Sequence, residues 1–428
     1  MLHSEKIKKS DGYGISRLMY IIEAALEYFI SMLVSGAYLA KATSEIGLSD
    51  SITGILSSFV SLGCGFQMLA IFLVNKRPVK RWVTALHILN QTFFALIYVV
   101  PFFKIPTAAK AAVFIAFLLL GHIINNVVNS PKINYFMSTV DDRKRGSFTA
   151  TKEIISLIGG MLFSFVSGLV IDSFDAAGNT EASFIYCGVT IFILMLLHTA
   201  TLLFSREKPV QALENHSVKD NIRELIRDKG LFKVILISVL WNVANYSTTP
   251  FHGTYQIKEL GFSMTYVSVI SIVMALSRSL FSKPLGKYAD RYSFVKMLNI
   301  CFTVELVAFA VFAFTVPENG HVLYIIYTIL HAIGMAGINS GAINLIYDYV
   351  DKERRTSALA LKSTFAGFAG FFTTLAVSPL VEHIQNNGNK FLGINLYAQQ
   401  ITSVIGFLMM IVILAYINLA FAKKGGQK

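Results

Sequence analysis

Long apolar runs alternate with short polar connections along almost the whole chain. A helix that crosses a hydrocarbon layer of about 30 Å needs roughly 20 mostly apolar residues. Twelve runs meet this length, at about 16–40, 51–74, 82–103, 111–137, 147–171, 183–204, 231–253, 264–282, 297–316, 321–347, 357–381 and 398–421. The pattern therefore predicts an all-α membrane protein with twelve transmembrane helices.

Composition supports a membrane protein rather than a soluble one. Hydrophobic residue types make up 54% of the 428 residues and charged types only 14%, whereas soluble domains carry about 25% charged residues. The basic N-terminal segment precedes an apolar run with two glutamates and no convincing cleavage site, so we expect a retained first span and not a signal peptide. The three cysteines, Cys64, Cys187 and Cys301, are too widely spaced to indicate a disulfide framework or a metal site, and no cofactor is expected.

The net charge of +12 is unevenly distributed over the connections. The five connections that share a side with both termini contain 20 Lys and Arg residues, and the six opposite connections contain 5. By the positive-inside rule, both termini are expected in the cytoplasm. Topology thus explains the basic charge, so no nucleic-acid partner is expected. We expect a multi-pass protein of the bacterial cytoplasmic membrane, monomeric within the lipid bilayer.

An internal repeat divides the chain into two halves. Displacement by 210 residues aligns "VVNSPKINYFMSTVDDRKRGSFTATK", from Val127, with "GINSGAINLIYDYVDKERRTSALALK", from Gly337, with ten identical positions. Each copy covers the end of an even-numbered helix, the cytoplasmic loop after it and the start of the next helix. Because the two copies occupy the same place in the membrane topology, the two halves have the same orientation. We therefore expect six-helix bundles at 1–204 and 231–428, joined by a cytoplasmic linker at 205–230. The end of the linker has helical spacing and could form a surface helix, but a plain linker is the interpretation that we favour.

A motif after the eighth span resembles a known signature. In "GKYADRYSFVK", the residues Gly286, Asp290, Arg291 and Lys296 match the loop signature of the major facilitator superfamily, while Ser293 replaces its usual glycine. The corresponding loop of the first half, "IFLVNKRPVKR", is a weaker copy in which Asn and Lys replace the Asp-Arg pair. Together with twelve spans, cytoplasmic termini and the parallel repeat, the chain resembles this superfamily over nearly its whole length.

The resemblance implies two pseudo-symmetric six-helix bundles around a central cavity that opens alternately to each side. The first, fourth, seventh and tenth spans would line the cavity. The loop residues Asp290, Arg291, Arg145 and Arg355 would belong to a cytoplasmic gate, with Asp290 pairing with Arg355 when the inner side is closed. The alternative is that these residues only fix topology and loop packing.

Two glutamates lie one helical turn apart in the first span. Glu23 and Glu27 share a polar face, and Glu27 lies near mid-span. A carboxylate inside the membrane is costly unless it is paired or protonated, which makes it a functional candidate. We expect Glu27, assisted by Glu23, to couple a proton to transport, with His122 and His331 as candidate partners. A structural ion pair or hydrogen bond is the alternative.

Polar residues also concentrate in the other three expected lining spans. Together with Glu27, the candidate solute contacts are His122, Asn125, Asn126, Trp241, Asn242, Asn245, Thr249, Tyr327 and His331. Amides and hydroxyls in membrane helices often serve only to hold helices together. Their concentration in the four spans nevertheless favours a wet, hydrogen-bonding pocket.

The sequence bears on three classes of function. The chain has neither a Gly-x-x-x-x-Gly-Lys-Ser/Thr phosphate loop nor a His-Glu-x-x-His metal helix, which disfavours an enzyme or an ATP-driven pump. A non-transporting receptor of the same fold is less favoured than a proton-coupled secondary transporter. The amides and aromatic rings suit a small polar solute such as a sugar or nucleoside. Export of amphipathic drugs or lipids is the alternative. The fifth span lacks the proline typical of drug antiporters, which argues against drug export. The abundance of aromatic residues, with 34 phenylalanines, argues for it.

Overall fold

The computed structural model describes residues 12–73, 79–141, 145–208, 218–350, 354–391 and 393–421. Almost all of these residues are helical. The elements of the first half are α1 (Gly14–Leu33), α2 (Gly36–Ile46), α3 (Asp50–Ser57), α4 (Phe59–Gly65), α5 (Met68–Leu73), α6 (Lys80–Leu96), η1 (Val100–Phe102), α7 (Thr107–Met137), α8 (Arg145–Ala176) and α9 (Thr180–Phe204).

The second half contains an extra helix before its first span and a short hairpin before its last helix. Its elements are α10 (Val218–Arg227), α11 (Lys229–Tyr246), η3 (Thr249–Phe251), α12 (His252–Thr254), η4 (Tyr255–Glu259), α13 (Met264–Arg291), α14 (Phe294–Ala313), α15 (Gly320–Tyr347), α16 (Arg355–Asn386), β1 (Lys390–Phe391), β2 (Ile394–Asn395) and α17 (Ala398–Phe421). The two short strands pair antiparallel, with Lys390 opposite Asn395.

The membrane-spanning character predicted from the apolar runs is confirmed. Within the described residues, ten helices are long and apolar enough to cross a membrane, or eleven if the bent pair α1 and α2 is one span. The expected third span corresponds to α6, which has 17 residues, followed by η1. Large apolar side chains such as Leu162 and Leu419 are exposed on the outside, at 65% and 83%, as a lipid-facing surface requires.

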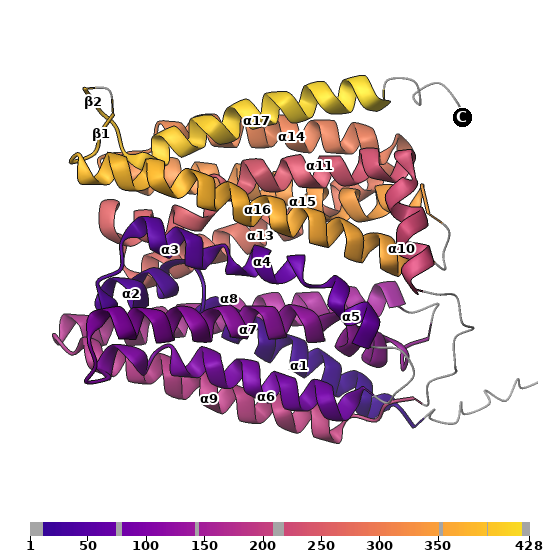
Figure 1. Ribbon diagram of the computed structural model, residues 1–428, viewed down its shortest axis with the longest axis horizontal. Helices are drawn as coiled ribbons and strands as arrows, with labels where there is room; N and C mark the ends of the chain where they lie inside the picture. Colours follow the sequence, from indigo (N-terminus) through magenta and orange to yellow (C-terminus); the bar gives the residue numbers. More distant parts are fainter. Residues whose placement is uncertain are drawn as a thin grey trace, which may run out of the picture.

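The helices of each half pack mainly against one another (Figure 1). In the first half α1 contacts α8 and α9, and α6 contacts α7 and α9; in the second, α14 contacts α15 and α17, and α11 contacts α16. Between the halves, α4 lies against α16 and α8 lies against α13. Most of the helix contacts thus lie within each half, and the division into two six-helix bundles remains a prediction from the repeat.

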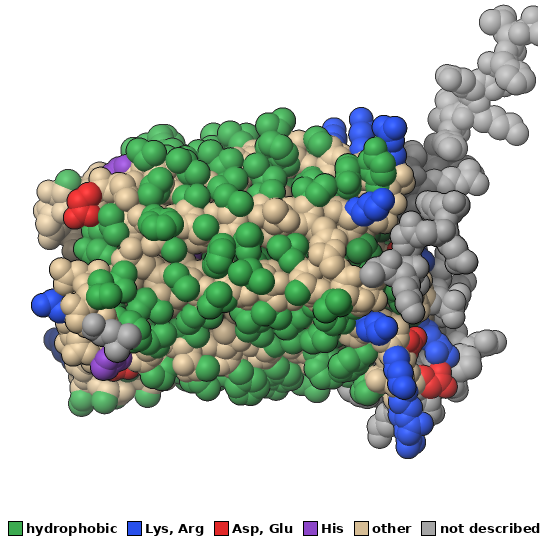
Figure 2. Space-filling view, turned by 90° about the horizontal axis from the view of Figure 1, so that it is seen from above, with side chains coloured by type: hydrophobic (Ala, Val, Ile, Leu, Met, Phe, Trp, Pro, Cys, Tyr) green, Lys and Arg blue, Asp and Glu red, His purple; other side chains and the backbone are tan. Residues whose placement is uncertain are grey.

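Charge distinguishes the two ends of the helical bundle. Helix α17 ends, and α1 begins, at the end where α5 and α10 lie (Figure 1). Lysine and arginine side chains gather at this same end in the space-filling view (Figure 2). We call it the basic end, and the opposite end, with α2 and the β-strands, the distal end.

The last part of the linker forms a helix, α10. The surface-helix alternative therefore describes this part better than the favoured plain-linker interpretation does. In α10, Leu225 is buried at 3% exposure within the core of the second half. Glu224 pairs with Arg354 at 2.7 Å. Asp228 then caps α11 by accepting hydrogen bonds from the amides of Gly230 and Leu231, which is a common start signal for a helix.

Candidate functional site

A buried charged cluster joins α1, α7 and α9 in the first half. The Lys132 ammonium lies 2.6 Å from Glu23 Oε1 and also donates a hydrogen bond to Glu27 Oε2. His198 Nε2 lies 2.8 Å from the same Glu23 oxygen. Two carboxylates therefore share one ammonium, and the imidazole is a third partner of Glu23.

The members of this cluster differ in burial. Glu23 and His198 have no exposed side-chain surface and Lys132 has 1%, whereas Glu27 retains 24%. Breaking such a buried pair by removing one partner leaves an uncompensated charge, which is strongly unfavourable. Glu27 is thus the member of the cluster whose side chain keeps an exposed surface.

Local sequence explains how α7 presents Lys132. Pro131 lies inside the helix, where proline removes one backbone hydrogen bond and bends the axis. Lys132 follows it directly, and Tyr135 and Phe136 one turn later are buried against Tyr20. The aromatic contact fixes the basic end of α7 against α1, and so holds the ammonium beside both glutamates.

The donor set of this cluster could in principle hold a metal ion. Ligand atoms of Glu23, Glu27 and His198 lie within 4.8 Å of one another. The Lys132 ammonium, however, contacts both carboxylates. The chain itself thus supplies the positive charge that the carboxylates require.

The predicted partners of Glu27 were wrong. His122 stacks edge-on against Phe94, with ring centroids 5.0 Å apart, and His331 contacts Glu305 in the second half. Glu27 pairs instead with Lys132.

The predicted amides of α7 contact neighbouring helices. Asn125 Oδ1 accepts a hydrogen bond from Asn90 on α6 at 3.2 Å. Asn126 donates to the His122 carbonyl at 3.0 Å, and its Oδ1 lies 3.3 Å from Cys64 Sγ on α4. Both amides are half-buried, so each has part of its surface free.

An aromatic group in the second half contains three of the predicted residues. The His331 ring stacks on Tyr327, with centroids 5.5 Å apart, and on Trp241 at 6.4 Å. Tyr327 also stacks on Phe312 at 4.1 Å. In the part of the chain that the structure describes, the Tyr327 hydroxyl is buried without a hydrogen-bond partner, which is rare for a buried polar group.

The predicted polar face of α11 is partly satisfied within its own segment. Asn242 donates to the Ser238 carbonyl at 2.9 Å, and the Thr249 hydroxyl donates to the Asn245 carbonyl at 2.9 Å. The Asn245 side-chain oxygen and the Ser238 hydroxyl are buried without partners. The amide of Asn245 is therefore the least satisfied of the three predicted contacts.

The predicted solute contacts form two separate groups in this structure. Glu27, with the α7 residues, lies in the first half, and Trp241, Tyr327 and His331 lie in the second. Within the described ranges, no hydrogen bond or ring contact joins the two groups directly.

The predicted gate residues lie at the basic end without the expected ion pair. Asp290 and Arg291 are exposed at the end of α13, and the Arg355 guanidinium lies 4.5 Å from the Tyr347 ring centroid. Among the residues that the structure describes, Asp290 and Arg355 form no ion pair with each other. Arg145 begins α8, but its side chain lies outside the described part. The pairing remains a prediction for a conformation closed at the basic end.

The two halves meet closely at the distal end. A Cβ atom at Gly253 would lie 2.3 Å from the Gly36 carbonyl oxygen, so only glycine allows α2 and α12 to approach this closely. Asp50 on α3 accepts from Lys258 at 2.5 Å and from Gln385 at 2.8 Å. Backbone contact and polar pairs thus close the distal end.

A second polar contact supports this closure. Both carboxylate oxygens of Asp172, on α8, accept hydrogen bonds from the first amides of α13, those of Met264 at 2.9 Å and Thr265 at 2.8 Å. At the basic end, by contrast, the repeat-related Ile133 and Ile343 remain 38% and 37% exposed. The structure is a conformation closed at the distal end.

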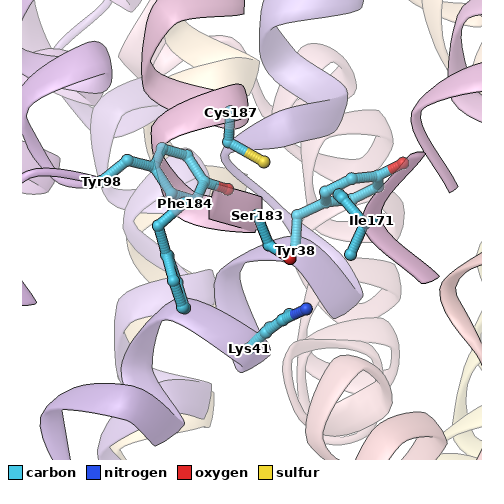
Figure 3. Close-up of a pocket in the computed structure, with 7 residues that line it drawn as sticks. All are labelled: Tyr38, Lys41, Tyr98, Ile171, Ser183, Phe184 and Cys187. Carbon is cyan, nitrogen blue, oxygen red and sulfur yellow. The ribbon is translucent and has the colours of Figure 1, made fainter. Parts of the chain in front are cut away.

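A small hollow lies within the first half near the distal end (Figure 3). It is lined by Tyr38, Lys41, Tyr98, Ile171, Ser183, Phe184 and Cys187. The predicted solute contacts are absent from this lining, and its aromatic and aliphatic walls offer little to a polar solute. We do not assign it to the transport site.

Three ionisable residues of these sites were missed by sequence reasoning: Lys132, His198 and Glu305. Two of them lie in the sixth and ninth spans, which are outside the four expected to line a cavity. The sequence did contain a signal for Lys132. Two glutamates in one membrane span require a cation nearby, and Lys132 is a cation that follows a proline inside another apolar run.

The chain matches the sequence profile of the Major Facilitator Superfamily over residues 20–374 and 257–427. No curated protein sequence matches it.

Solved transporters share its fold. A mutant form of the nucleoside transporter NupG superposes with a TM-score of 0.72 at 17% identity, covering 95% of this chain and 100% of that one. A D-xylose-proton symporter gives a TM-score of 0.72 at 15% identity, with coverages of 94% and 97%. A bacterial homologue of the human lysosomal transporter Spinster, solved inward-facing and unoccupied, gives 0.68 at 13% identity, with coverages of 96% and 97%. The profile match spans most of the chain, and the protein therefore belongs to the Major Facilitator Superfamily of non-enzymatic membrane transporters.

Proposed function

We propose that the protein is a secondary active transporter that moves a small polar organic solute by alternating access, coupled to protons at Glu27. The observation that carries the proposal is the buried Glu23–Lys132–Glu27 cluster, in which two carboxylates share one ammonium. Proton binding to Glu27 leaves Lys132 with one anionic partner, Glu23. Because Glu27 keeps 24% exposure while Glu23 has none, Glu27 is the carboxylate that exchanges protons.

The position of Glu27 links protonation to conformation. It lies on α1, and after a bend of 42° the chain continues as α2, which contacts α12 at the distal closure. Any movement that opens the distal end must therefore move α2 relative to α12. Such a movement also changes the setting of α1, which carries Glu27. Proton binding and distal opening thus act on one continuous segment.

The second-half site supports the proposed solute class. Trp241, Tyr327 and His331 offer ring faces, and unpartnered polar atoms lie on Ser238, Asn245 and Tyr327. Rings with adjacent hydrogen-bonding groups suit a solute that is itself a polar ring, such as a sugar or nucleoside. The shared fold with a nucleoside transporter and a D-xylose-proton symporter supports this class.

We propose that both termini lie in the cytoplasm, as the positive-inside rule predicts. The basic end is then the cytoplasmic end, and the structure, closed at the distal end, faces the cytoplasm. We further propose that the protein acts as a monomer in the bacterial cytoplasmic membrane.

Uptake by the purified full chain in proteoliposomes tests the function. Labelled uridine, D-xylose and D-glucose are supplied outside with an imposed inward proton gradient, and ethidium serves as the probe for drug export. We expect one polar compound to accumulate, and its accumulation to collapse when a protonophore is added. Binding without flux would indicate a receptor, and ethidium movement alone would indicate a drug exporter; either result would refute the proposal.

A further inference from the structure

A second acidic group is buried in the other half of the molecule. Glu305, on α14, has no exposed side-chain surface, and its Oε2 lies 2.9 Å from His331 Nδ1 on α15. A Cβ atom at Gly334 would lie 2.4 Å from Glu305 Oε1. The absence of a side chain at this position therefore makes room for the carboxyl group. The pair is a built feature of the α14–α15 contact.

The surroundings of this pair contain no compensating cation. Within the described part of the chain, the titratable groups that face it are Cys301 on α14, Tyr327 on α15 and His252 on α12. Glu305 Oε1 is buried without a hydrogen-bond partner. A lone negative charge in such an environment costs several kcal/mol, so the pair is expected to be neutral overall.

Neutrality fixes where the protons lie. A neutral pair holds two exchangeable protons, of which the Oε2–Nδ1 hydrogen bond contains one. Placing the other on Oε1 would leave a buried O–H without an acceptor, which is itself unfavourable. The second proton therefore lies on Nε2, whether the pair is written as acid with imidazole or as carboxylate with imidazolium.

The Nε2 atom of His331 is available to a ligand. Among the described residues Nε2 has no hydrogen-bond partner, and unlike Nε2 of His252 it is not among the wholly buried unpartnered atoms. The His331 side chain keeps 8% exposure while its ring stacks on Tyr327 and Trp241. A donor fixed in direction and flanked by aromatic rings is thus presented at the predicted solute position.

We propose that Glu305 is a positioning residue that keeps Nε2 of His331 protonated, so that the transport site selects a ring-shaped solute with an acceptor oxygen. This inference deepens the proposed transport function and rests on it for the identity of the site. It names Glu305, on the ninth span, as a determinant of specificity that acts through His331 without contacting the solute.

The protonation of His331 can be measured without any solute. The full chain, labelled with [¹⁵N]histidine in lipid nanodiscs at pH 7, is compared with His331→Phe to assign the resonances. We expect a directly bonded proton on Nε2 in the wild type and in Glu305→Gln, whose carboxamide can donate to Nδ1. In Glu305→Leu and Gly334→Ala, in which the Nδ1 contact is lost or displaced, we expect a mixture of tautomers. A wild-type Nε2 without a proton would overturn the proposal, and so would an unchanged tautomer in Glu305→Leu.

Solute affinity provides the second measurement, with uridine or D-xylose as the probe, whichever the wild type binds. His331→Phe and Glu305→Leu should each weaken binding by about tenfold, the equivalent of one hydrogen bond, whereas Glu305→Gln should stay within about threefold. Thr328→Val is the matched control, because its hydroxyl donates to the Tyr324 carbonyl of its own helix. Equal losses in Glu305→Gln and Glu305→Leu would overturn the positioning role. A wild type that moves none of the compounds would refute transport, while the tautomer measurement would still decide the role of Glu305.

Discussion

Replacing Lys132 by methionine removes the ammonium of the first-half cluster while keeping a long apolar side chain. In the wild type the ammonium lies 2.6 Å from Glu23 and also contacts Glu27. The variant would leave Glu23, which has no exposed surface, without its main positive partner. The folded variant must then take up a proton at this site or keep an unpaired buried charge.

The cost of that proton sets the magnitude. An ordinary glutamate titrates near pH 4.3, and each pH unit above this value costs about 1.4 kcal/mol for the protonated form. At pH 7 the cost is about 3.7 kcal/mol for Glu23. Glu27 is partly exposed, so solvent screens its charge and its contribution is smaller. We therefore expect Lys132→Met to lower the free energy of unfolding by about 3–5 kcal/mol, as for other broken buried pairs.

The same reasoning predicts the pH dependence of the variant. Its folded state binds a proton that the unfolded state does not hold at pH 7, so its stability rises as pH falls toward 4.3. Between pH 7 and pH 5 the difference from wild type should shrink by about 2.7 kcal/mol.

The assay is reversible unfolding by SDS in mixed micelles at both pH values. Lys110→Met is the matched control, since Lys110 lies at the start of the same helix and bonds only to the Pro101 carbonyl. The double variant Glu23→Gln/Lys132→Met should recover much of the lost stability. A loss no larger than that of Lys110→Met, or a loss that does not change with pH, would refute the interpretation of Lys132 as the essential counter-ion.

Three further predictions concern the gates and the solute face. Gly253→Ala should separate α2 from α12, because its Cβ would lie 2.3 Å from the Gly36 carbonyl; faster hydrogen exchange in α2 would show this, and unchanged exchange would argue against a tight distal contact. Charge reversal of Asp290 should reduce transport, and the opposite reversal of Arg355 should partly restore it, whereas purely additive losses in the double-mutant cycle would exclude the pair. A cysteine at Asn245, in a chain without the native cysteines, should react with a water-soluble thiol reagent and be protected by the transported solute; an unreactive cysteine would show a packed face.

The hydrophobic pattern predicted most of the fold because membrane helices are specified by length and apolarity alone. It could not reveal the break between α1 and α2, since this break depends on Gly36 at φ 54° and on its contact with Gly253 in the other half. The third expected span corresponds to a helix of only 17 residues, shorter than the candidate membrane helices of the described chain. The break between α1 and α2 thus involves a contact between the halves and not local composition alone.

Local sequence patterns indicate single polar faces of the candidate site, but not the contacts between helices that complete it. The polar face with Glu27 follows from helical spacing within one segment, whereas its pairing with Lys132 depends on how α1 and α7 pack. Tyr327 and His331 were predicted on one face of the tenth span and Trp241 on the seventh, and the structure brings the three rings together. Glu305 was missed because the resemblance directed attention to four spans, although a glutamate inside an apolar run is itself a signal.

The central claim is that Glu27 couples protons to solute movement, and Glu27→Gln tests it most directly. The amide keeps the size of the carboxylate and mimics its protonated form, so the variant should lose accumulation driven by a proton gradient. Exchange of labelled for unlabelled solute across the same proteoliposome membrane should remain close to wild type, because it requires no net proton movement. Accumulation by Glu27→Gln with unaltered pH dependence would contradict the account and would assign the Glu23–Lys132–Glu27 cluster to structure alone.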